Sequence, residues 1–271
     1  MIERAEESGR LKPGYTIVES STGNTATSLA FVGAVKGYKV KIFSSEDSLT
    51  DEKRKTLTRY GAQFETRARM LPGEAGVAGE VVEWPGRIKC KELEKRDLTV
   101  WWARQFSNRE NVLAHSNMGI EILKQLNAKV DVWISSIGTG GNFMGVAKAL
   151  KERNPRLRCV AVEPTGWAGH ESILSGWKSG AKKVVPDITG GIVKQIVDDG
   201  IVDEIVQVSN EDARNMAYRL SREEGMFCGI STGANVFAAM NEAKKLGLGK
   251  NVVTVAVDSG DRYFSDERYI T

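Results

Sequence analysis

Short apolar runs alternate with amphipathic stretches along most of this chain. The apolar runs are typical of strands, and the stretches between them repeat their apolar residues at helical spacing. Strands are expected at 15–19, 38–43, 62–66, 98–102, 132–134, 157–163 and 252–257. Helices are expected after the loop at 20–25, over 50–60 and 111–126, and after Ser209 and Gly229. The last strand runs are continuously apolar, which suits strands buried on both faces of a parallel sheet. The alternation predicts an α/β protein.

The segment 130–150 carries the clearest local signal, VDVWISSIGTGGNFMGVAKAL. A strand run leads into Gly138-Thr139-Gly140-Gly141, and a helix pattern follows. Glycines before a helix leave its first backbone N–H groups and the positive end of its dipole open to an anion. The segment therefore predicts a cup for a phosphate group. Two further loops of glycine and hydroxyl residues, 20–25 and 229–233, also precede helices.

The 138–141 loop by itself leaves the phosphate compound open. Gly138 and Gly140 match the first two glycines of the dinucleotide pattern G-x-G-x-x-G, and Glu163 ends the next strand run, where a ribose-binding acid would lie. Phe143 stands at the third glycine, where it would crowd the contact between helix and strand. A nucleotide site and a plain buried turn both remain possible on this loop alone.

Composition narrows the classes of function. The chain has 271 residues, 41% hydrophobic and 27% charged, with a net charge of +3, and no basic cluster is interleaved with aromatics. Nucleic acid is therefore not an expected partner. Three widely spaced cysteines and two histidines without metal-ligand spacing predict neither a disulfide framework nor a metal site, although Cys228 lies beside a glycine loop where a ligand could touch it. With no long apolar run and a charged N-terminus, we expect a cytoplasmic protein that does not span a membrane.

Seven short motifs together resemble the fold-type II pyridoxal-phosphate (PLP) enzymes, and most closely the cysteine synthase and cystathionine β-synthase group. They occur in the order of that family. The motifs are IERAEESGRLKPGYTIVESSTGNT (2–25), YGA (60–62), QFSN (105–108), IGTGGN (137–142), VEP (162–164), GISTGA (229–234) and SGDRYFS (259–265). The resemblance implies two three-layer αβα domains with mostly parallel sheets, like the tryptophan synthase β chain. It implies a smaller substrate-lid domain at 10–110 and a larger domain that binds the PLP phosphate at 111–271, with 1–9 as the end of a helix.

The resemblance also implies the cofactor, pyridoxal 5′-phosphate, and residue roles. Cofactor binding falls to Asn24 at the ring oxygen, to Ser231 at the pyridine nitrogen, and to the phosphate loop of Gly138, Thr139, Gly140, Gly141 and Asn142, where Asn142 replaces the family threonine. Substrate binding falls to Ser21, Thr22, Gly23 and Thr25 around the α-carboxylate, with Gln105 assisting. Gly190 and Gly191 match a family loop near the substrate amine. For each side chain, a cap or turn role is the alternative.

One family feature is missing. The family lysine that forms the Schiff base with the cofactor lies in an S-x-K-x-R segment upstream of the residue that matches Met1, and this chain contains no such segment. No catalytic residue is therefore assigned, and we expect an N-terminally truncated fold. A shortened product or misassigned start, a separate N-terminal polypeptide and a degenerate homologue all remain open.

The resemblance implies β-replacement, in which an activated serine loses its β-substituent and sulfide or a thiol adds. We expect a homodimer whose activity is impaired without the lysine. The alternatives are a serine/threonine dehydratase or threonine-synthase-like enzyme, and a non-catalytic protein that keeps the fold to bind a partner.

Overall fold

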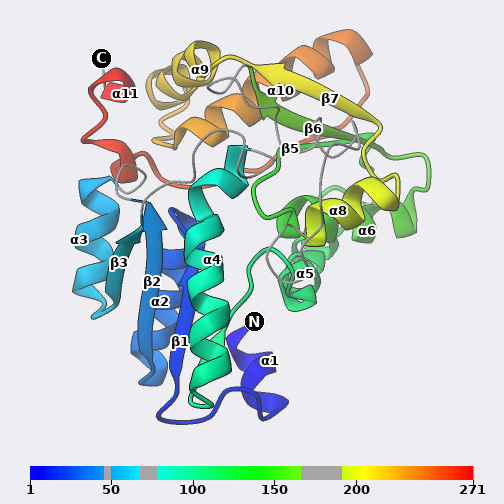
Figure 1. The fold of residues 1–271 in the computed structure, drawn as a ribbon. Helices are drawn as coiled ribbons and strands as arrows, with labels where there is room; N and C mark the ends of the chain where they lie inside the picture. The colour runs from blue at the N-terminus through cyan, green and yellow to red at the C-terminus, as the bar shows by residue number, and fades with distance from the viewer. Residues whose placement is uncertain (46–49, 68–77, 128, 166–190, 271) are drawn as a thin grey trace. The chain divides into compact units, whose positions relative to one another are not determined.

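The computed structural model describes residues 1–45, 50–67, 78–127, 129–165 and 191–270 (Figure 1). These residues form two compact units. Unit 1 contains Met1–Glu110 and Gly191, and unit 2 contains the other described residues from Asn111 onward. Each unit is described by itself.

Unit 1 is built on a parallel sheet of four strands in the order β3-β2-β1-β4. Its strands are β1 (Thr16–Ser20), β2 (Lys39–Ser45), β3 (Gln63–Arg67) and β4 (Val100–Trp102). Its helices are α1 (Ile2–Glu7), α2 (Asn24–Lys36), α3 (Asp51–Arg59) and α4 (Ala78–Arg96).

Successive side chains of β1 point to opposite faces, so each face builds its own core. Ile17 packs with α1, α2 and α3 residues on one face. Val18 packs with Phe43, Trp102 and Cys90 of α4 on the other. Figure 1 shows α4 running along the sheet. Helices on both faces make unit 1 a three-layer αβα structure.

Unit 2 repeats this strand arrangement, with a parallel sheet in the order β7-β6-β5-β8. Its strands are β5 (Val132–Ser136), β6 (Arg158–Pro164), β7 (Glu204–Val208) and β8 (Val252–Val253). Its helical elements are α5 (Arg109–Gln125, which begins in unit 1), α6 (Gly141–Arg153), α8 (Gly191–Asp198), α9 (Asn210–Glu223), α10 (Ile230–Leu246), a 3₁₀ turn at Gly260–Tyr263 and α11 (Glu267–Ile270).

Strands β5 and β6 are buried on both faces. Trp133 and Cys159 pack with α5, α6 and α8, whereas Ile134 and Val160 pack with α9 and α10. This two-sided burial explains why their sequences are continuously apolar instead of alternating. The predicted α/β class with two αβα units and parallel sheets is confirmed.

Most predicted elements occur where the periodicity placed them, but β7 and α8 lie in segments for which no element was predicted. The run 252–257 was expected to be a strand throughout, but only Val252–Val253 is extended in the sheet. The stretch from Arg67 to Asp97, which proline-glycine pairs interrupt, gives no clear periodicity in the sequence, yet it contains α4. This helix includes Pro85 and packs so closely that a Cβ on Gly86 would lie 2.3 Å from Ser20 Oγ. Gly86 therefore allows the helix to approach the sheet.

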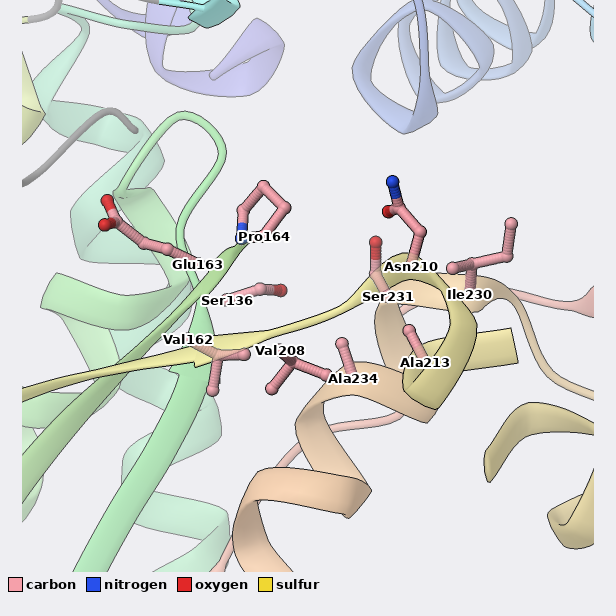
Figure 2. A pocket seen from close by; sticks show the side chains of 10 residues that line it. All are labelled: Ser136, Val162, Glu163, Pro164, Val208, Asn210, Ala213, Ile230, Ser231 and Ala234. Carbon is pink, nitrogen blue, oxygen red and sulfur yellow. The ribbon is translucent and has the colours of Figure 1, made fainter. Parts of the chain in front are cut away.

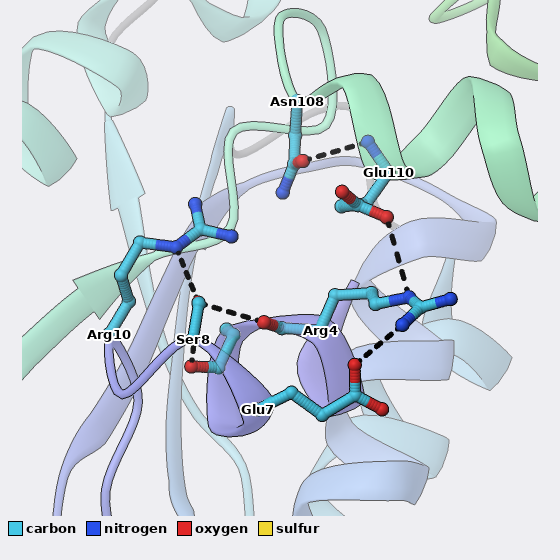
Figure 3. Close-up of polar contacts among 7 residues, drawn as sticks. Arg4, Glu7, Ser8, Arg10, Asn108 and Glu110 are labelled. Atoms are coloured by element: carbon cyan, nitrogen blue, oxygen red, sulfur yellow. Dashed lines mark hydrogen bonds and ion pairs between the residues drawn. The ribbon is translucent and has the colours of Figure 1, made fainter.

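Polar contacts tie α1 to the beginning of α5 within unit 1 (Figure 3). The Arg4 guanidinium pairs with Glu7 at 2.6 Å and reaches Glu110 at 3.8 Å. Ser8 Oγ donates to the Arg4 carbonyl oxygen at 2.8 Å and accepts from Arg10 Nε at 2.9 Å. Exposed pairs of this kind contribute little each, so buried Ile2 and Ala5 supply most of the anchoring. Across the described segments, no helix is long and apolar enough to cross a membrane.

Candidate active site

Both sheets contain a point where the strand order reverses. In unit 1 the chain moves from β1 to β2 on one side, while β4 pairs with β1 on the other. In unit 2 it moves from β5 to β6 on one side, while β8 pairs with β5 on the other. Ligands of open α/β sheets bind at the carboxyl ends of strands beside such a reversal. The predicted site loops follow these strands: 20–25 follows β1, Gln105 follows β4, and 138–142 follows β5.

The loop after β5 has the backbone geometry of an anion cup. Gly140 caps α6 with φ +86°, a left-handed conformation that glycine adopts without strain. The first helical bond runs from Met144 N to the Gly140 carbonyl oxygen at 2.9 Å. The N–H groups of residues 141–143 precede that bond, and Thr139 Oγ1 accepts from Gly141 N at 3.3 Å. The structure therefore gathers the predicted residues Gly138 to Asn142 at one helix N-terminus.

Packing fixes one side of this loop and leaves the other side open. A Cβ on Gly140 would lie 2.9 Å from Ile192 and Ile196 of α8, and one on Gly141 would lie 2.4 Å from Asn111. A Cβ on Gly138 would meet no atom within 4 Å among the described residues. The open side at Gly138 provides room for a phosphate group.

Asn111 supports the loop and was missed by the sequence analysis. Its side chain is buried, and Nδ2 donates to Thr139 Oγ1 at 3.1 Å. It lies near the start of a helix, where one asparagine in an amphipathic pattern gives no sign of a contact 28 residues away. Asn142 Nδ2 lies 3.3 Å from Met118 Sδ, and its buried Oδ1 has no hydrogen-bond partner within the described part of the chain.

A cavity of about 210 Å³ lies at the carboxyl ends of β5, β6 and β7 in unit 2. Figure 2 shows Ser136 at the end of β5 and Ser231 at the start of α10 on facing sides of it, with the Glu163 carboxyl group directed away from Ser231. Its lining is mostly apolar and includes Val162, Pro164, Val208, Ala213, Ile230 and Ala234. The cavity combines apolar walls with two hydroxyl groups and the neutral Asn210 amide, which suits an uncharged aromatic ring.

The third glycine loop positions Ser231. Gly229 caps α10, and buried Thr232 accepts at Oγ1 from Val257 N at 2.9 Å, so the loop is held to the segment after β8. Cys228 is 2% exposed and is not among the residues that line the cavity. Burial raises the pKa of its thiol, which disfavours the reactive thiolate. We therefore assign Cys228 a packing role.

In unit 1, the predicted substrate loop begins α2. Gly23 is the N-cap residue of this helix, and buried Ser21 accepts at Oγ from Gly23 N at 3.3 Å and from Ala26 N, in the first turn, at 3.2 Å. The predicted neighbours Thr22, Gly23, Asn24 and Thr25 are half-buried. The structure thus places all five residues at one helix N-terminus.

The loop after β4 holds Gln105 against the substrate loop. Gln105 is 3% exposed, and its Nε2 donates to the Ser20 carbonyl oxygen at 2.5 Å. Arg104 adopts φ +54°, and Asn108 closes the turn by donating from Nδ2 to the Ala103 carbonyl oxygen at 2.9 Å. The predicted partners of the α-carboxylate, Gln105 and the 21–25 loop, are therefore neighbours within unit 1.

Glu19 lies beneath both loops and was also missed by the sequence analysis. It is fully buried at the end of β1, and burial raises the pKa of its carboxyl group from 4.5 to about 7 although three N–H groups donate to it. The one feature of the sequence that could have indicated this buried acid is a glutamate at the end of an apolar strand run. Among the remaining predictions, Gly191 begins α8, whereas Gly190 lies outside the described residues. The searched residues contain no cluster of three or more histidine, cysteine or acidic side chains suited to a metal.

Taken unit by unit, the fold and these loops define an α/β protein with a glycine loop suited to a phosphate group and, at the carboxyl ends of the same sheet, an apolar cavity that contains a serine hydroxyl. The glycine loop at the start of α6 and the Ser231 hydroxyl in an apolar cavity fit PLP. The family model described as pyridoxal-phosphate dependent enzyme matches residues 1–258. The chain belongs to this family, and its cofactor is PLP. This finding excludes the nucleotide interpretation of the 138–141 loop.

Relatives and solved structures place the chain among cysteine synthases and similar enzymes. Cysteine synthase of Staphylococcus aureus is 38% identical over 271 residues, which cover 99% of this chain and 82% of the relative. The structure is similar to that of cysteine synthase from Entamoeba histolytica, with a TM-score of 0.79 and 31% identity over 100% of this chain and 76% of the other. It is also similar to a hydrogen sulfide-producing enzyme of Fusobacterium nucleatum, with a TM-score of 0.80 and 32% identity over 97% of this chain and 84% of the other.

Proposed function

We propose that this chain is a PLP-dependent enzyme of the cysteine synthase type, which replaces the β-substituent of an activated serine by sulfide or a thiol. The observation that carries the proposal is the pairing, within unit 2, of an open glycine loop at the start of α6 with an apolar cavity that contains Ser231. Bound PLP supplies an electron sink that lets an amino acid lose its α-proton and then its β-substituent.

The residues of unit 2 hold and tune the cofactor in this proposal. The N–H groups of residues 141–143 and the Thr139 hydroxyl bind the phosphate at the positive end of α6. The Ser231 hydroxyl faces the pyridine nitrogen as a neutral partner. A hydroxyl would not stabilise a protonated ring nitrogen as a carboxylate would, so Ser231 would moderate the electron sink that the bound cofactor supplies and thereby favour β-elimination over other reactions at the α-carbon.

The residues of unit 1 bind the amino acid. The N-terminus of α2, with Ser21, Thr22, Gly23 and Thr25, binds the α-carboxylate, and Gln105 supports it. Asn24 hydrogen-bonds the ring oxygen of the cofactor. We accordingly assign substrate binding to 10–110, as a lid, and phosphate binding to 111–271. Homodimeric assembly and a cytoplasmic location belong to the same proposal, and sedimentation equilibrium tests the first.

The proposal separates cofactor binding from turnover. No S-x-K-x-R segment occurs in residues 1–271. A lysine in that segment would hold the cofactor and remove the α-proton, so we expect this chain to bind PLP and to turn over slowly by itself.

The first experiment is an absorbance spectrum with added PLP, followed by borohydride reduction and peptide mass mapping. We expect PLP to bind without reduced PLP attached to one specific lysine. A specific lysine adduct would show that another base exists and would overturn the expectation of slow turnover. If PLP fails to bind at all, the proposed function is wrong.

Two variants of Gly138 test whether the loop after β5 is the phosphate site. Gly138→Asp places a negative charge in the open space and should weaken PLP binding at least tenfold by isothermal titration calorimetry. Gly138→Ala is the matched control without charge and should weaken binding less. Equal affinity of wild type and Gly138→Asp would exclude this loop.

An assay with O-acetyl-L-serine, with and without sulfide, identifies the reaction. Cysteine formed only with sulfide supports the replacement reaction, whereas pyruvate formed equally in both arms supports the dehydratase alternative. The assay uses whichever preparation of the protein consumes O-acetyl-L-serine at a measurable rate. The structural similarity to a hydrogen sulfide-producing enzyme makes the arm without sulfide necessary.

A further inference from the structure

Glu19 accepts hydrogen bonds from both segments of unit 1 that carry the proposed substrate residues. Its Oε1 accepts from Ser20 N at 2.9 Å and from Trp102 Nε1 at 2.9 Å. Its Oε2 accepts from Gln105 N at 2.8 Å. One carboxyl group therefore joins the end of β1 to the end of β4 and the turn that follows it.

A fourth hydrogen bond closes this connection. Gln105 Nε2 donates back to the Ser20 carbonyl oxygen at 2.5 Å, so Ser20 and Gln105 are linked through Glu19 and also directly. Ser20 is the residue before Ser21, whose hydroxyl accepts from Ala26 N in the first turn of α2. Displacement of Ser20 would move the helix N-terminus to which we assign the α-carboxylate.

The position is costly for an acid. Glu19 is 0% exposed. The charged groups near it in the described part of unit 1 include buried Arg87 of α4, which favours the ionised form and lies 3.4 Å from the centre of the Phe106 ring. The Arg104–Glu94 pair contacts Trp102, one of its hydrogen-bond donors. In some proteins a buried ionisable group fixes one arrangement of its neighbours through its hydrogen bonds. Here two of the three donors are backbone N–H groups, one at the end of β1 and one in the turn after β4, and a side chain without an oxygen atom could not accept from both.

We propose that Glu19 is a positioning residue that sets the N-terminus of α2 and Gln105 in the arrangement that binds the substrate carboxylate. The identity of the ligand, an amino-acid carboxylate, rests on the proposed function. The arrangement of the two segments around Glu19 does not depend on that function and is tested separately.

Hydrogen exchange of the protein without added ligand tests the arrangement. Glu19→Gln keeps the size of the side chain but presents an NH₂ group to donors that need an acceptor. We expect at least tenfold faster amide exchange at Ser20 and Gln105, and unchanged exchange within 130–150 of unit 2. Unchanged exchange at both positions would overturn the proposal. Trp102→Phe removes one donor and leaves the carboxyl group, so it should raise exchange less and remains informative if Glu19→Gln does not fold.

Ligand binding tests the consequence. L-alanine is used as the probe because it has no β-substituent to lose, and it is titrated into PLP-loaded protein by calorimetry. We expect Glu19→Gln to weaken L-alanine binding at least tenfold while PLP affinity stays within threefold of wild type.

Glu94→Gln is the matched control. Glu94 also holds the segment after β4, because it accepts from Trp102 N at 3.0 Å and from Arg104. Unlike Glu19, it accepts no hydrogen bond from Ser20 N or Gln105 N among the described residues. We expect its L-alanine affinity to stay within threefold of wild type. Equal losses in Glu19→Gln and Glu94→Gln would indicate general anchoring and would overturn the positioning role. If wild-type protein binds no PLP, the proposed function fails while the exchange experiment still decides the role of Glu19.

Discussion

Replacing Gly233 by alanine tests the packing that positions Ser231. Gly233 lies in the first turn of α10, two residues after Ser231, where α10 packs against α9. An added Cβ would lie 2.0 Å from the Ala213 carbonyl oxygen and 2.8 Å from Ala217 N. Both atoms are backbone, so no side chain can rotate out of the way, and the helices must separate by at least 1.0 Å to bring the closest contact to 3.0 Å.

Two opposing effects decide the magnitude. Replacing glycine by alanine within a helix raises the free energy of unfolding by about 1 kcal/mol. Overpacking against a rigid neighbour typically costs about 1–3 kcal/mol and more where backbone must move. We expect a net loss of about 2 kcal/mol, which corresponds to a decrease in Tm of about 4–8 °C for a domain of this size class. Because the shift also moves Ser231, PLP affinity should fall.

The assay is urea unfolding followed by far-UV circular dichroism, together with calorimetric titration of PLP. Ala243→Gly is the control, because Ala243 lies in the same helix but is exposed. It should lose about 1 kcal/mol through helix propensity alone and keep its PLP affinity. A Gly233→Ala protein that is as stable as wild type, or more stable, would refute the reasoning about the α9–α10 contact.

Three further changes have defined outcomes. Asn111→Ala removes the hydrogen bond to Thr139 in the proposed phosphate loop and should lower the free energy of unfolding by about 1 kcal/mol. Calorimetry should show PLP binding weakened several-fold, and a PLP affinity equal to that of wild type would contradict the supporting role of Asn111. Arg158→Met removes a charged partner of the Glu242 carboxylate, whose side chain is 3% exposed, and should lower the free energy of unfolding in urea by about 2 kcal/mol. The double variant Arg158→Met/Glu242→Gln should recover part of that loss, because no buried charge is then left without its partner. Burial raises the pKa of Glu19 from 4.5 to about 7, so between these values the folded state binds more protons than the unfolded state. Stability should therefore fall by about 3 kcal/mol as pH rises from below 4.5 to above 7, and Glu19→Gln should remove that part of the pH dependence; an unchanged slope would show that the carboxyl group stays ionised.

The sequence alone predicted most of the elements and the location of the glycine loops, although it gave no sign of β7 or α8. The strand runs at 132–134 and 157–163 and the helix after Ser209 all occur in the structure. Ser209 Oγ accepts from Asp212 N at 2.9 Å, as its capping-box spacing indicates. Such features are readable because helix bonds and strand periodicity involve neighbours in the chain. The family motifs supplied the cofactor and the αβα architecture.

The tertiary structure decided which polar residues support those loops. Glu19 lies in an apolar strand run, and its partner Gln105 is 86 residues away, so the contact exists only because β1 and β4 are adjacent in the sheet. Asn111 reaches Thr139 only because α5 and α6 pack together at Gly145, where a Cβ would lie 2.3 Å from the Val112 carbonyl oxygen. Strand order and close helix packing depend on contacts between residues far apart in the sequence. Such contacts produce no periodic pattern around Glu19 or Asn111 from which they could be predicted. The sequence thus determined most of the elements and the cofactor class, and the packing of sheets and helices determined the buried groups that hold the proposed binding loops.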